Sequence, residues 1–244
     1  MPEVKLHVAL IRHTLSPEET VALGARLCYS RATIGDLTRR VSAKDQSDFV
    51  RKIMGMGHDS VLEHASFTFG VEGVSRVLLA QLTRHRLASF SVQSQRYVSY
   101  EQGFGYIVPP KIAALGQDAA DEYARQMDQM HQWYCQWQER LGAEGESSNE
   151  DARFVLPNAA ETKIVVTMNA RSLLHFFEER CCNRAQWEIH QVANMMLAEC
   201  RRVAPTLFEM AGPTCEVGRF CREGSRSCGK LEALLKADAA KASK

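Results

Sequence analysis

Cationic and hydroxyl side chains gather between Gln81 and Tyr97, a combination suited to binding an anion. The segment contains three arginines, one histidine and three serines, and no acidic residue stands between Gln81 and Glu101. The cations are Arg84, His85, Arg86 and Arg96. Because they have no acidic neighbour in the sequence, their expected partner is an anion from outside the chain. A guanidinium group presents a planar fork of donors that matches two phosphate oxygens at once. The segment therefore predicts a site for a phosphorylated small molecule.

Two other interpretations of this basic segment remain open. Clusters of arginine also bind nucleic acid, and cations at the end of a helix can simply complement the helix dipole. The whole chain has 30 lysines and arginines against 29 aspartates and glutamates, so its basic charge is concentrated and not spread over a surface. This balance favours a small anion over a nucleic acid and leaves the structural role open.

Composition indicates an ordinary globular protein of 244 residues, with 45% hydrophobic and 24% charged residues. The apolar runs are far shorter than the roughly 20 residues that cross a bilayer. The first residues lack a basic region followed by an apolar stretch, so they do not resemble a secretory signal. We therefore expect a cytoplasmic protein that has no membrane partner.

The chain has eight cysteines, and in the cytoplasm they are expected to stay reduced. Cys215, Cys221 and Cys228 stand in a Gly-rich basic stretch from Gly212 to Lys230. Three cysteines can ligate zinc, but a structural site usually needs four ligands and a tight Cys-x-x-Cys pair, which is missing there. The sequence therefore predicts no metal site and favours a loop-rich tail or an oligomer contact.

Hydrophobic periodicity predicts both strands and helices. Alternating apolar residues predict strands over residues 4–10, 65–71 and 162–168. Helical spacing predicts helices over residues 16–28, 42–56, 74–84, 118–141, 171–180 and 185–202. The segment 89–97 reads as a loop or an irregular strand, and 142–149 as a polar loop. Beyond Gly229 the Ala- and Lys-rich sequence predicts a frayed helix or a disordered tail.

Three residues are expected to start helices with their side chains. Ser16 with Glu19, and Ser60 with Glu63, have the spacing of a capping box. Asn169 is expected to cap the helix over residues 171–180. No glycine pattern of a dinucleotide-binding fold or a P-loop occurs in the sequence.

The helix over residues 171–180 carries cations on two faces. Arg171 and His175 are four positions apart and share a face, whereas Arg180 lies about 180° around from Arg171. Either Arg180 is solvated and complements the helix dipole, or the helix stands between two ligands and serves both. The sequence alone leaves both interpretations open.

Four blocks of the chain resemble the flavin-dependent thymidylate synthase family. The first is Arg84-His85-Arg86 followed after seven residues by Ser94, extended by Ala88-Ser89 and Gln95-Arg96-Tyr97. The others are Gly57 to His64 with Phe67-Thr68-Phe69, Asn169 to Leu173, and Arg180 followed by Ala185-Gln186-Trp187-Glu188. The blocks stand in the family's order, and the likeness covers about residues 5–211.

The resemblance implies an α+β fold with mixed helices packed on a mainly antiparallel sheet, assembled as a homotetramer that shares its FAD sites between subunits. It implies a single catalytic domain over residues 1–211, followed by a Cys-containing extension over 212–244. The implied activity is that of a methyltransferase converting dUMP to dTMP. The carbon comes from 5,10-methylenetetrahydrofolate and the reducing equivalents from NADPH through FAD, without an enzyme nucleophile. A non-catalytic nucleotide or nucleic-acid binding module of the same fold is the alternative.

The resemblance also assigns site residues. The residues that match dUMP contacts are Gln81, Arg84, Ser94, Gln95, Arg96, Arg153 and Arg180. Those that match FAD contacts are Ser60, Arg84, His85, Arg86, Val92, Asn169, Arg171 and His175. Arg180 matches the arginine that polarises the pyrimidine N3 edge and is the predicted catalytic residue. Two positions depart from the family: Val92 often has a polar counterpart, so a contact there is expected through the backbone, and His175 replaces an asparagine of some relatives.

Overall fold

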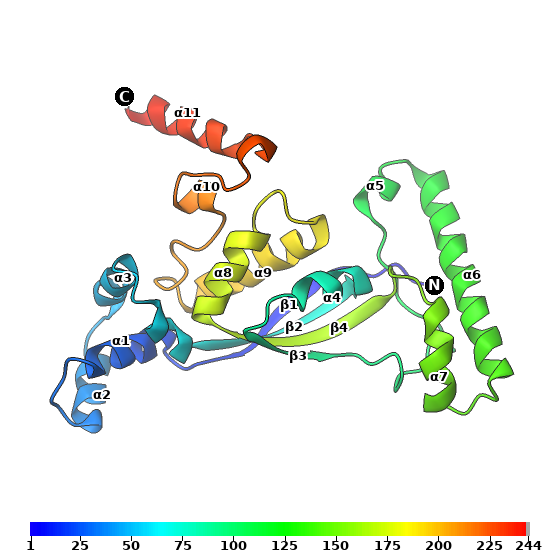
Figure 1. Ribbon diagram of the computed structural model, residues 1–244, viewed down its shortest axis with the longest axis horizontal. Coiled ribbons are helices and arrows are strands. Elements are labelled where there is room, and N and C mark those ends of the chain that lie inside the picture. The colour runs from blue at the N-terminus through cyan, green and yellow to red at the C-terminus, as the bar shows by residue number, and fades with distance from the viewer. Residues whose placement is uncertain (243–244) are drawn as a thin grey trace. The chain divides into compact units, whose positions relative to one another are not determined.

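The computed structural model describes residues 1–242, which form helices and a four-stranded sheet (Figure 1). The strands are β1 (His7–His13), β2 (Ser66–Ser75), β3 (Ala88–Val92) and β4 (Glu161–Asn169), in the order β1-β2-β4-β3. The longer helices are α1 (Pro17–Leu27), α2 (Ile34–Ser42), α3 (Ser47–Gly55), α6 (Gln117–Arg140), α8 (Ala170–Arg180), α9 (Trp187–Val203) and α11 (Lys230–Ala242). The shorter ones are α4 (Arg76–Leu82), α5 (Pro110–Ala113), α7 (Glu146–Ala152), α10 (Thr214–Val217) and the 3-10 helices η1 (Asp59–His64), η2 (Arg153–Val155) and η3 (Gly224–Arg226). Helices combined with an antiparallel sheet confirm the predicted α+β class.

The chain divides into two compact units. Unit 1 contains residues Met1–Val8, Gly70–Arg84 and Phe90–Val166, and unit 2 contains Ala9–Phe69, His85–Ser89 and the chain from Thr167 onward. Residues 212–242 are grouped with unit 2, and the expected domain boundary after residue 211 stays a prediction. Within residues 1–242, no helix combines the length and apolar character that a membrane span requires.

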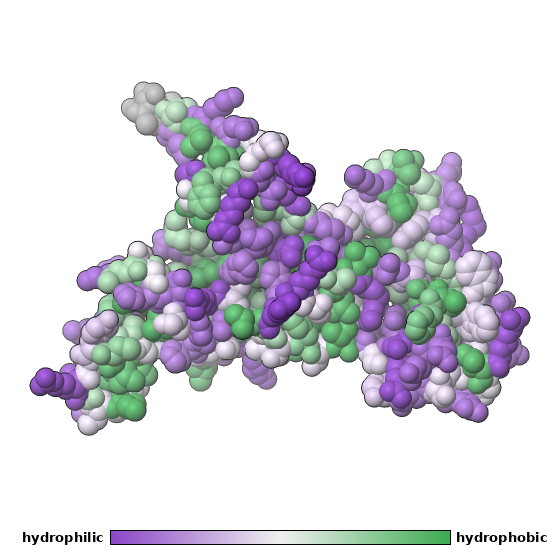
Figure 2. Space-filling model, viewed as in Figure 1, coloured by the Kyte–Doolittle hydropathy of each residue, from purple (hydrophilic) through white to green (hydrophobic). Residues whose placement is uncertain are grey.

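Aromatic residues form the core of unit 1. The long helix α6 contributes Met127 and Tyr134, which are seven positions apart and so share one face. They pack with Tyr100, Phe104 and Tyr106. The rings of Tyr100 and Tyr134 meet edge to face with centroids 6.2 Å apart. Figure 2 shows hydrophobic residues exposed among hydrophilic ones over the α5–α7 segment.

A second aromatic cluster forms the core of unit 2. Phe67 of β2 meets Phe208 edge to face at 5.3 Å, and Phe177 of α8 lies 5.9 Å from Phe208. Phe176 and Phe177 are neighbours in α8 and are both fully buried. Through this cluster, the segment after α9 packs against α8, the helix that carries Arg171, His175 and Arg180.

Gly73 in β2 occupies a position that a side chain would not fit. Its φ is +66°, and a Cβ atom would lie 1.9 Å from the Lys5 carbonyl oxygen. The Gly73 amide donates a hydrogen bond of 3.1 Å to the Glu161 carboxylate. A glycine is therefore required where β2 passes the N-terminal segment of unit 1.

The predicted helix over residues 42–56 is wrong in its first turn, and α2 was missed. Asp45 accepts hydrogen bonds from the amide and hydroxyl of Ser47, at 3.1 and 2.8 Å. Gln46 donates to the carbonyls of Val41 and Lys44, at 2.8 and 2.9 Å. These side chains form hydrogen bonds with the backbone groups between the two helices. Helix α2 therefore ends at Ser42, and α3 begins at Ser47.

Two of the three predicted caps are wrong. Ser16 has a φ of 44° and its side chain makes no capping hydrogen bond, while Glu19 accepts from the Ser42 hydroxyl at 2.6 Å. Ser60 and Glu63 both lie inside η1, which starts one residue before Ser60. The third cap is confirmed, because the Asn169 side chain accepts from the Ser172 amide at 2.8 Å.

The polar loop predicted over residues 142–149 is also only partly correct. Helix α7 begins at Glu146, and the side chains of Ser148 and Asn149 are buried. Ser148 accepts from the Glu144 amide and donates to the Leu141 carbonyl, at 2.9 and 3.0 Å. The local sequence does not predict that these polar residues are buried, because their burial depends on contacts with Gln138 and Leu141, at the end of α6.

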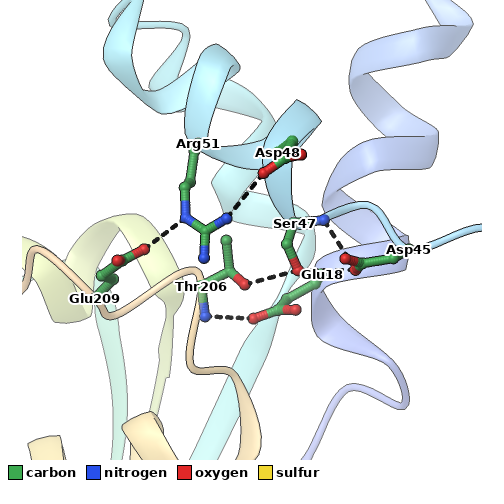
Figure 3. A network of polar contacts seen from close by, with 7 residues as sticks. All are labelled: Glu18, Asp45, Ser47, Asp48, Arg51, Thr206 and Glu209. Atoms are coloured by element: carbon green, nitrogen blue, oxygen red, sulfur yellow. Dashed lines mark hydrogen bonds and ion pairs between the residues drawn. The ribbon is translucent and has the colours of Figure 1, made fainter.

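A polar network joins α1, α3 and the segment after α9 in unit 2 (Figure 3). The Thr206 amide donates to Glu18 at 2.6 Å, and its hydroxyl donates to Ser47 at 3.2 Å. Arg51 reaches Glu209 at 2.7 Å. Thr206 is buried with 5% of its surface exposed, so water is a poor replacement for the Glu18 acceptor.

We expect Glu18→Ala to lower the free energy of unfolding by about 1–3 kcal/mol, because it leaves the buried Thr206 amide without its acceptor. Urea denaturation measures the change. Glu19→Ala is the matched control, since within residues 1–242 the neighbouring Glu19 accepts only from the exposed Ser42 hydroxyl. Equal losses of unfolding free energy in the two variants would contradict a stabilising role for the hydrogen bond between Glu18 and Thr206.

Candidate active site

The turn after β3 in unit 1 is organised by Ser94. Its hydroxyl oxygen accepts hydrogen bonds from the amides of Arg96 and Tyr97, at 3.1 and 3.4 Å. The strand ends at Val92, and the following amide of Gln93 still donates to Lys163 of β4 at 2.9 Å. A hydroxyl that accepts can also donate its own proton, so Ser94 keeps a donor for a ligand.

Arg96 has internal partners, which corrects the expectation that only an external anion would meet it. Its guanidinium contacts Glu146 at 2.8 Å and Glu150 at 2.9 Å, one turn apart on α7. Arg153 donates from Nε to the Glu150 carbonyl at 3.0 Å. The structure thus brings two predicted substrate residues, Arg96 and Arg153, together around Glu150, a residue that sequence reasoning missed.

A buried network holds the backbone of this turn. The Asn149 side-chain amide donates to the Arg96 carbonyl at 2.9 Å, and its oxygen accepts from the Tyr134 hydroxyl at 3.0 Å. The Gln138 side chain also donates to Asn149, and Tyr134 accepts from the Tyr100 amide at 3.2 Å. Helices α6 and α7 therefore position the turn through one asparagine.

The remaining predicted substrate residues of unit 1 lie differently. Gln95 is buried, and its side chain hydrogen-bonds to Tyr100, so it faces the interior of the unit. Gln81 lies in the last turn of α4, and Arg84 is exposed just beyond that helix. Across the described residues 1–242, neither Arg84 nor Arg86 forms an ion pair, so both guanidinium groups can receive an anion.

His85 and Arg180 meet in unit 2. The Arg180 Nε donates to His85 Nε2 at 3.0 Å. The His85 ring also lies edge to face with Phe176 at 4.9 Å and with His175 at 6.1 Å. Since arginine can only donate, His85 Nε2 must be unprotonated, and the proton of the neutral ring stays on Nδ1.

The setting of His85 changes its charge. Burial, the positive charge of Arg180 and the proximity of His175 lower the pKa of His85 from 6.5 to about 4. The sequence grouped His85 with the cations, and this is corrected: near neutral pH it offers one N–H donor and no charge. The positive charge beside it belongs to Arg180, which is half-buried and forms no ion pair with a carboxylate in residues 1–242.

We expect His85 to stay neutral as the pH falls through 6.5 and to titrate near 4. A depressed folded-state pKa means that the folded protein binds the proton less readily than the unfolded chain. Its contribution to stability is therefore present above pH 6.5 and is lost as the pH falls towards 4. NMR of the imidazole nitrogens measures both the midpoint and the Nδ1–H tautomer. A midpoint near 6.5, or an Nε2–H tautomer, would contradict the described contact.

One face of α8 lines an open groove of about 390 Å³ in unit 2. Arg171, His175 and Glu178 line it from the helix, with Asp59 of η1 and the segment Met210–Phe220 opposite. Arg171 also forms an ion pair of 2.6 Å with Glu63 of η1, which sequence reasoning assigned to a cap. The prediction that Arg171 and His175 share a face is confirmed.

Arg180 lies outside this groove lining but is not isolated from it. His85 contacts Arg180 on one side and His175 on the other, so the two faces of α8 are linked through one imidazole. Of the other predicted flavin contacts, Asn169 starts α8 as its cap and Ser60 is exposed on η1. The sequence left Arg180's surroundings open, and the structure assigns it a specific partner.

The cysteines whose thiol pKa is raised are poor nucleophiles. Burial raises the pKa of Cys181 to about 12 and also raises the pKa of Cys200, Cys135 and Cys215. Because the thiolate is the attacking form, these cysteines favour the inert thiol.

The sequence is similar to those of known proteins. The family model described as thymidylate synthase complementing protein matches residues 9–206. The chain is 52% identical to the flavin-dependent thymidylate synthase of Geobacter sulfurreducens, covering 92% of this chain and 94% of that protein. The chain belongs to the flavin-dependent thymidylate synthase family. Two further members of this family, from Clostridium tetani and Nitratidesulfovibrio vulgaris, are each 46% identical, covering 94% of this chain and 95% and 97% of those proteins.

Most of the contacts described above lie within the part of the chain that matches the family model. The match over residues 9–206 includes β3, the Ser94 turn, α7 and all of α8. The extension that follows, with Cys215, Cys221 and Cys228, lies beyond it. The individual roles of the site residues stay predictions.

Proposed function

We propose that the chain is a flavin-dependent thymidylate synthase that methylates dUMP to dTMP, with 5,10-methylenetetrahydrofolate as carbon donor and NADPH as reductant. The observation that carries the proposal is Arg180, a half-buried guanidinium whose hydrogen-bond partner is the neutral His85. A cation held in this way retains its charge for a ligand. This is the arrangement needed to polarise a pyrimidine without a nucleophilic residue.

The donor chemistry of unit 2 fits FAD. The cofactor needs cationic and N–H donors for its two phosphates and an open surface for its rings. Arg86 is an exposed cation, His85 offers its Nδ1–H, and the groove beside Arg171 and His175 is open. Together with Ser60 and Asn169 of the same unit, these residues would hold FAD. Arg84 and Val92, which belong to unit 1, stay proposed FAD contacts, Val92 through its backbone. When bound, FAD supplies the hydride chemistry that connects NADPH to the methyl transfer.

The Ser94 turn and its arginines are proposed to bind the dUMP phosphate. Ser94 donates its hydroxyl proton, and Arg96 and Arg153 supply charge beside it. Arg96 would exchange one of its two carboxylate partners for the phosphate, since both pairs are exposed to solvent and such pairs contribute only about 0–1 kcal/mol each. Gln81 and Arg84 are proposed to contact the same nucleotide. Because Gln95 faces the interior, its contact is proposed through its backbone.

Arg180 is the proposed catalytic residue. Its guanidinium stays protonated at any working pH, so it can stabilise negative charge that develops at the pyrimidine N3 edge. The hydrogen bond to His85 fixes the direction of the fork and occupies only Nε. The other guanidinium nitrogens keep their donors for the substrate.

We propose that copies of the chain assemble and act in the cytoplasm. A homotetramer with shared FAD sites is supported by large apolar side chains on the surface, such as Trp133 and Trp137, which are 47% and 45% exposed on α6. Contacts between copies of the chain would cover them. We propose cytoplasmic small-molecule chemistry with no nucleic-acid partner, in keeping with the near-zero net charge of +1.

The function is tested with the purified full chain. The protein is expected to be yellow and to oxidise NADPH faster when dUMP is added, with dTMP appearing only when methylenetetrahydrofolate is present. A colourless protein that cannot be loaded with FAD would favour the non-catalytic binding module. A yellow protein whose NADPH oxidation ignores dUMP would point to another substrate.

A further inference from the structure

Four cysteines line one small cavity at the end of α8. Cys182 comes from the residues just after α8, and Cys215, Cys221 and Cys228 come from the C-terminal extension. All four are free thiols. The sequence placed only three of them together, and a fourth sulfur ligand was the element missing for a metal site.

The neighbouring Cys181 shows that the choice of Cys182 is specific. Cys181 is buried with 3% of its surface exposed and does not line the cavity. Cys182, one residue further along, is half-buried and lines it. The turn that ends α8 therefore separates the pair, directing one thiol to the protein interior and the other to the extension.

The size of the cavity limits what can occupy it. Its volume is about 50 Å³, whereas a single water needs about 10–15 Å³ on the same measure. The space suits one metal ion and is too small for an organic cofactor. Four sulfur ligands in a closed site are typical of structural Zn²⁺, which binds them in a tetrahedron.

Ion pairs beside this cavity connect the extension to α8. Arg222 contacts Glu178 at 2.5 Å and Glu179 at 3.5 Å. Lys230 forms an ion pair with Glu216 beside Cys215. Four thiolates around a dication carry a net charge of −2, and Arg222 and Lys230 at the cavity wall would offset part of it.

We propose that Cys182, Cys215, Cys221 and Cys228 bind one Zn²⁺ that fastens the extension to the end of α8. In residues 1–242 as described, no three metal-ligand side chains are already arranged to hold an ion, so binding draws the thiols together. Between Val217 and Lys230 the only regular element is the one-turn η3, and few backbone hydrogen bonds oppose this movement. Each thiol releases its proton to solvent, and the site then holds the chain two residues after Arg180.

The test measures metal directly and does not depend on thymidylate synthesis. The full chain, purified without chelator, is expected to contain one zinc per chain by mass spectrometry. Cys221→Ser and Cys228→Ser are expected to lose it. Cys28→Ser, which changes an exposed cysteine at the end of α1, is the matched control and is expected to keep it.

A second measurement uses the unmodified chain, so that a poorly folding variant does not decide the outcome. Zinc is removed and Co²⁺ is added. Sulfur-to-cobalt charge-transfer bands and the visible bands of a tetrahedral ion are expected. Protein that contains no zinc as purified and gives no Co²⁺ bands, Co²⁺ bands of six-coordinate type, iron in place of zinc, or a disulfide among these four cysteines would each overturn the proposal.

Discussion

Replacing Arg180 by alanine is expected to lower kcat/KM for dTMP formation by about 10²–10³-fold, the usual effect of removing one group that stabilises charge in a transition state. The substitution removes a half-buried cation and also the donor to His85 Nε2. We expect the variant to remain yellow, because Arg84, Arg86 and Arg171 are still present to hold the cofactor. Steady-state kinetics and the flavin absorbance of the purified protein measure both effects.

The comparison variants separate charge from geometry. Arg180→Lys retains a cation but loses the planar fork, so we expect it to recover only part of the activity. Arg202→Ala is the control, since Arg202 is an exposed arginine near the end of α9 paired with Glu199. Unchanged kcat/KM in Arg180→Ala would contradict the catalytic role. Loss of flavin in that variant would show that His85 and Arg180 together serve the cofactor.

Asn149→Ala is expected to destabilise the protein and to weaken dUMP binding. It removes the acceptor of the Tyr134 hydroxyl and the Gln138 amide and the donor to the Arg96 carbonyl, all in a buried setting. We expect the free energy of unfolding to fall by about 2–4 kcal/mol, because several buried polar groups lose their partners at once. The Ser94 turn loses its support, and the KM for dUMP is expected to rise about tenfold.

Urea denaturation and steady-state kinetics test this second prediction. Tyr134→Phe removes two hydrogen bonds, the one to Asn149 and the one from the Tyr100 amide. It keeps the contacts of Asn149 with Gln138 and the Arg96 carbonyl, so it is expected to have a smaller effect on both quantities. Gln129→Ala, on the exposed face of α6 where the Gln129 side chain hydrogen-bonds to Gln132, is the control and is expected to change stability by less than about 0.5 kcal/mol. An Asn149→Ala variant that is stable but fails to bind dUMP would instead indicate direct contact with the nucleotide.

Helices and strands were predictable where one face of the segment is buried along its whole length, because the apolar residues then repeat with a regular period. Helix α6 at Gln117–Arg140 and strand β4 at Glu161–Asn169 lie within a residue of their expected ends. The Asn169 cap was also predictable, because an N-cap is a contact between residues three positions apart. Predictions failed where a side chain had a choice of partners: Glu63, expected to cap, pairs with Arg171, and Glu19 pairs with Ser42.

The sequence by itself determined most strands and helices, the basic segment that is proposed to bind an anion, and the motif blocks that resemble the family, from which the α+β class was expected. Periodicity, residue chemistry and short spacings are local properties. Only the tertiary structure decided which charges are engaged: Glu146 and Glu150 hold Arg96, while Arg180 has His85 as its partner and leaves that imidazole neutral. It also brought Cys182 to the three cysteines of the extension. Charge neutralisation, desolvation and ligand sets depend on atoms that are close in space, and such contacts between distant segments leave no trace in local spacing.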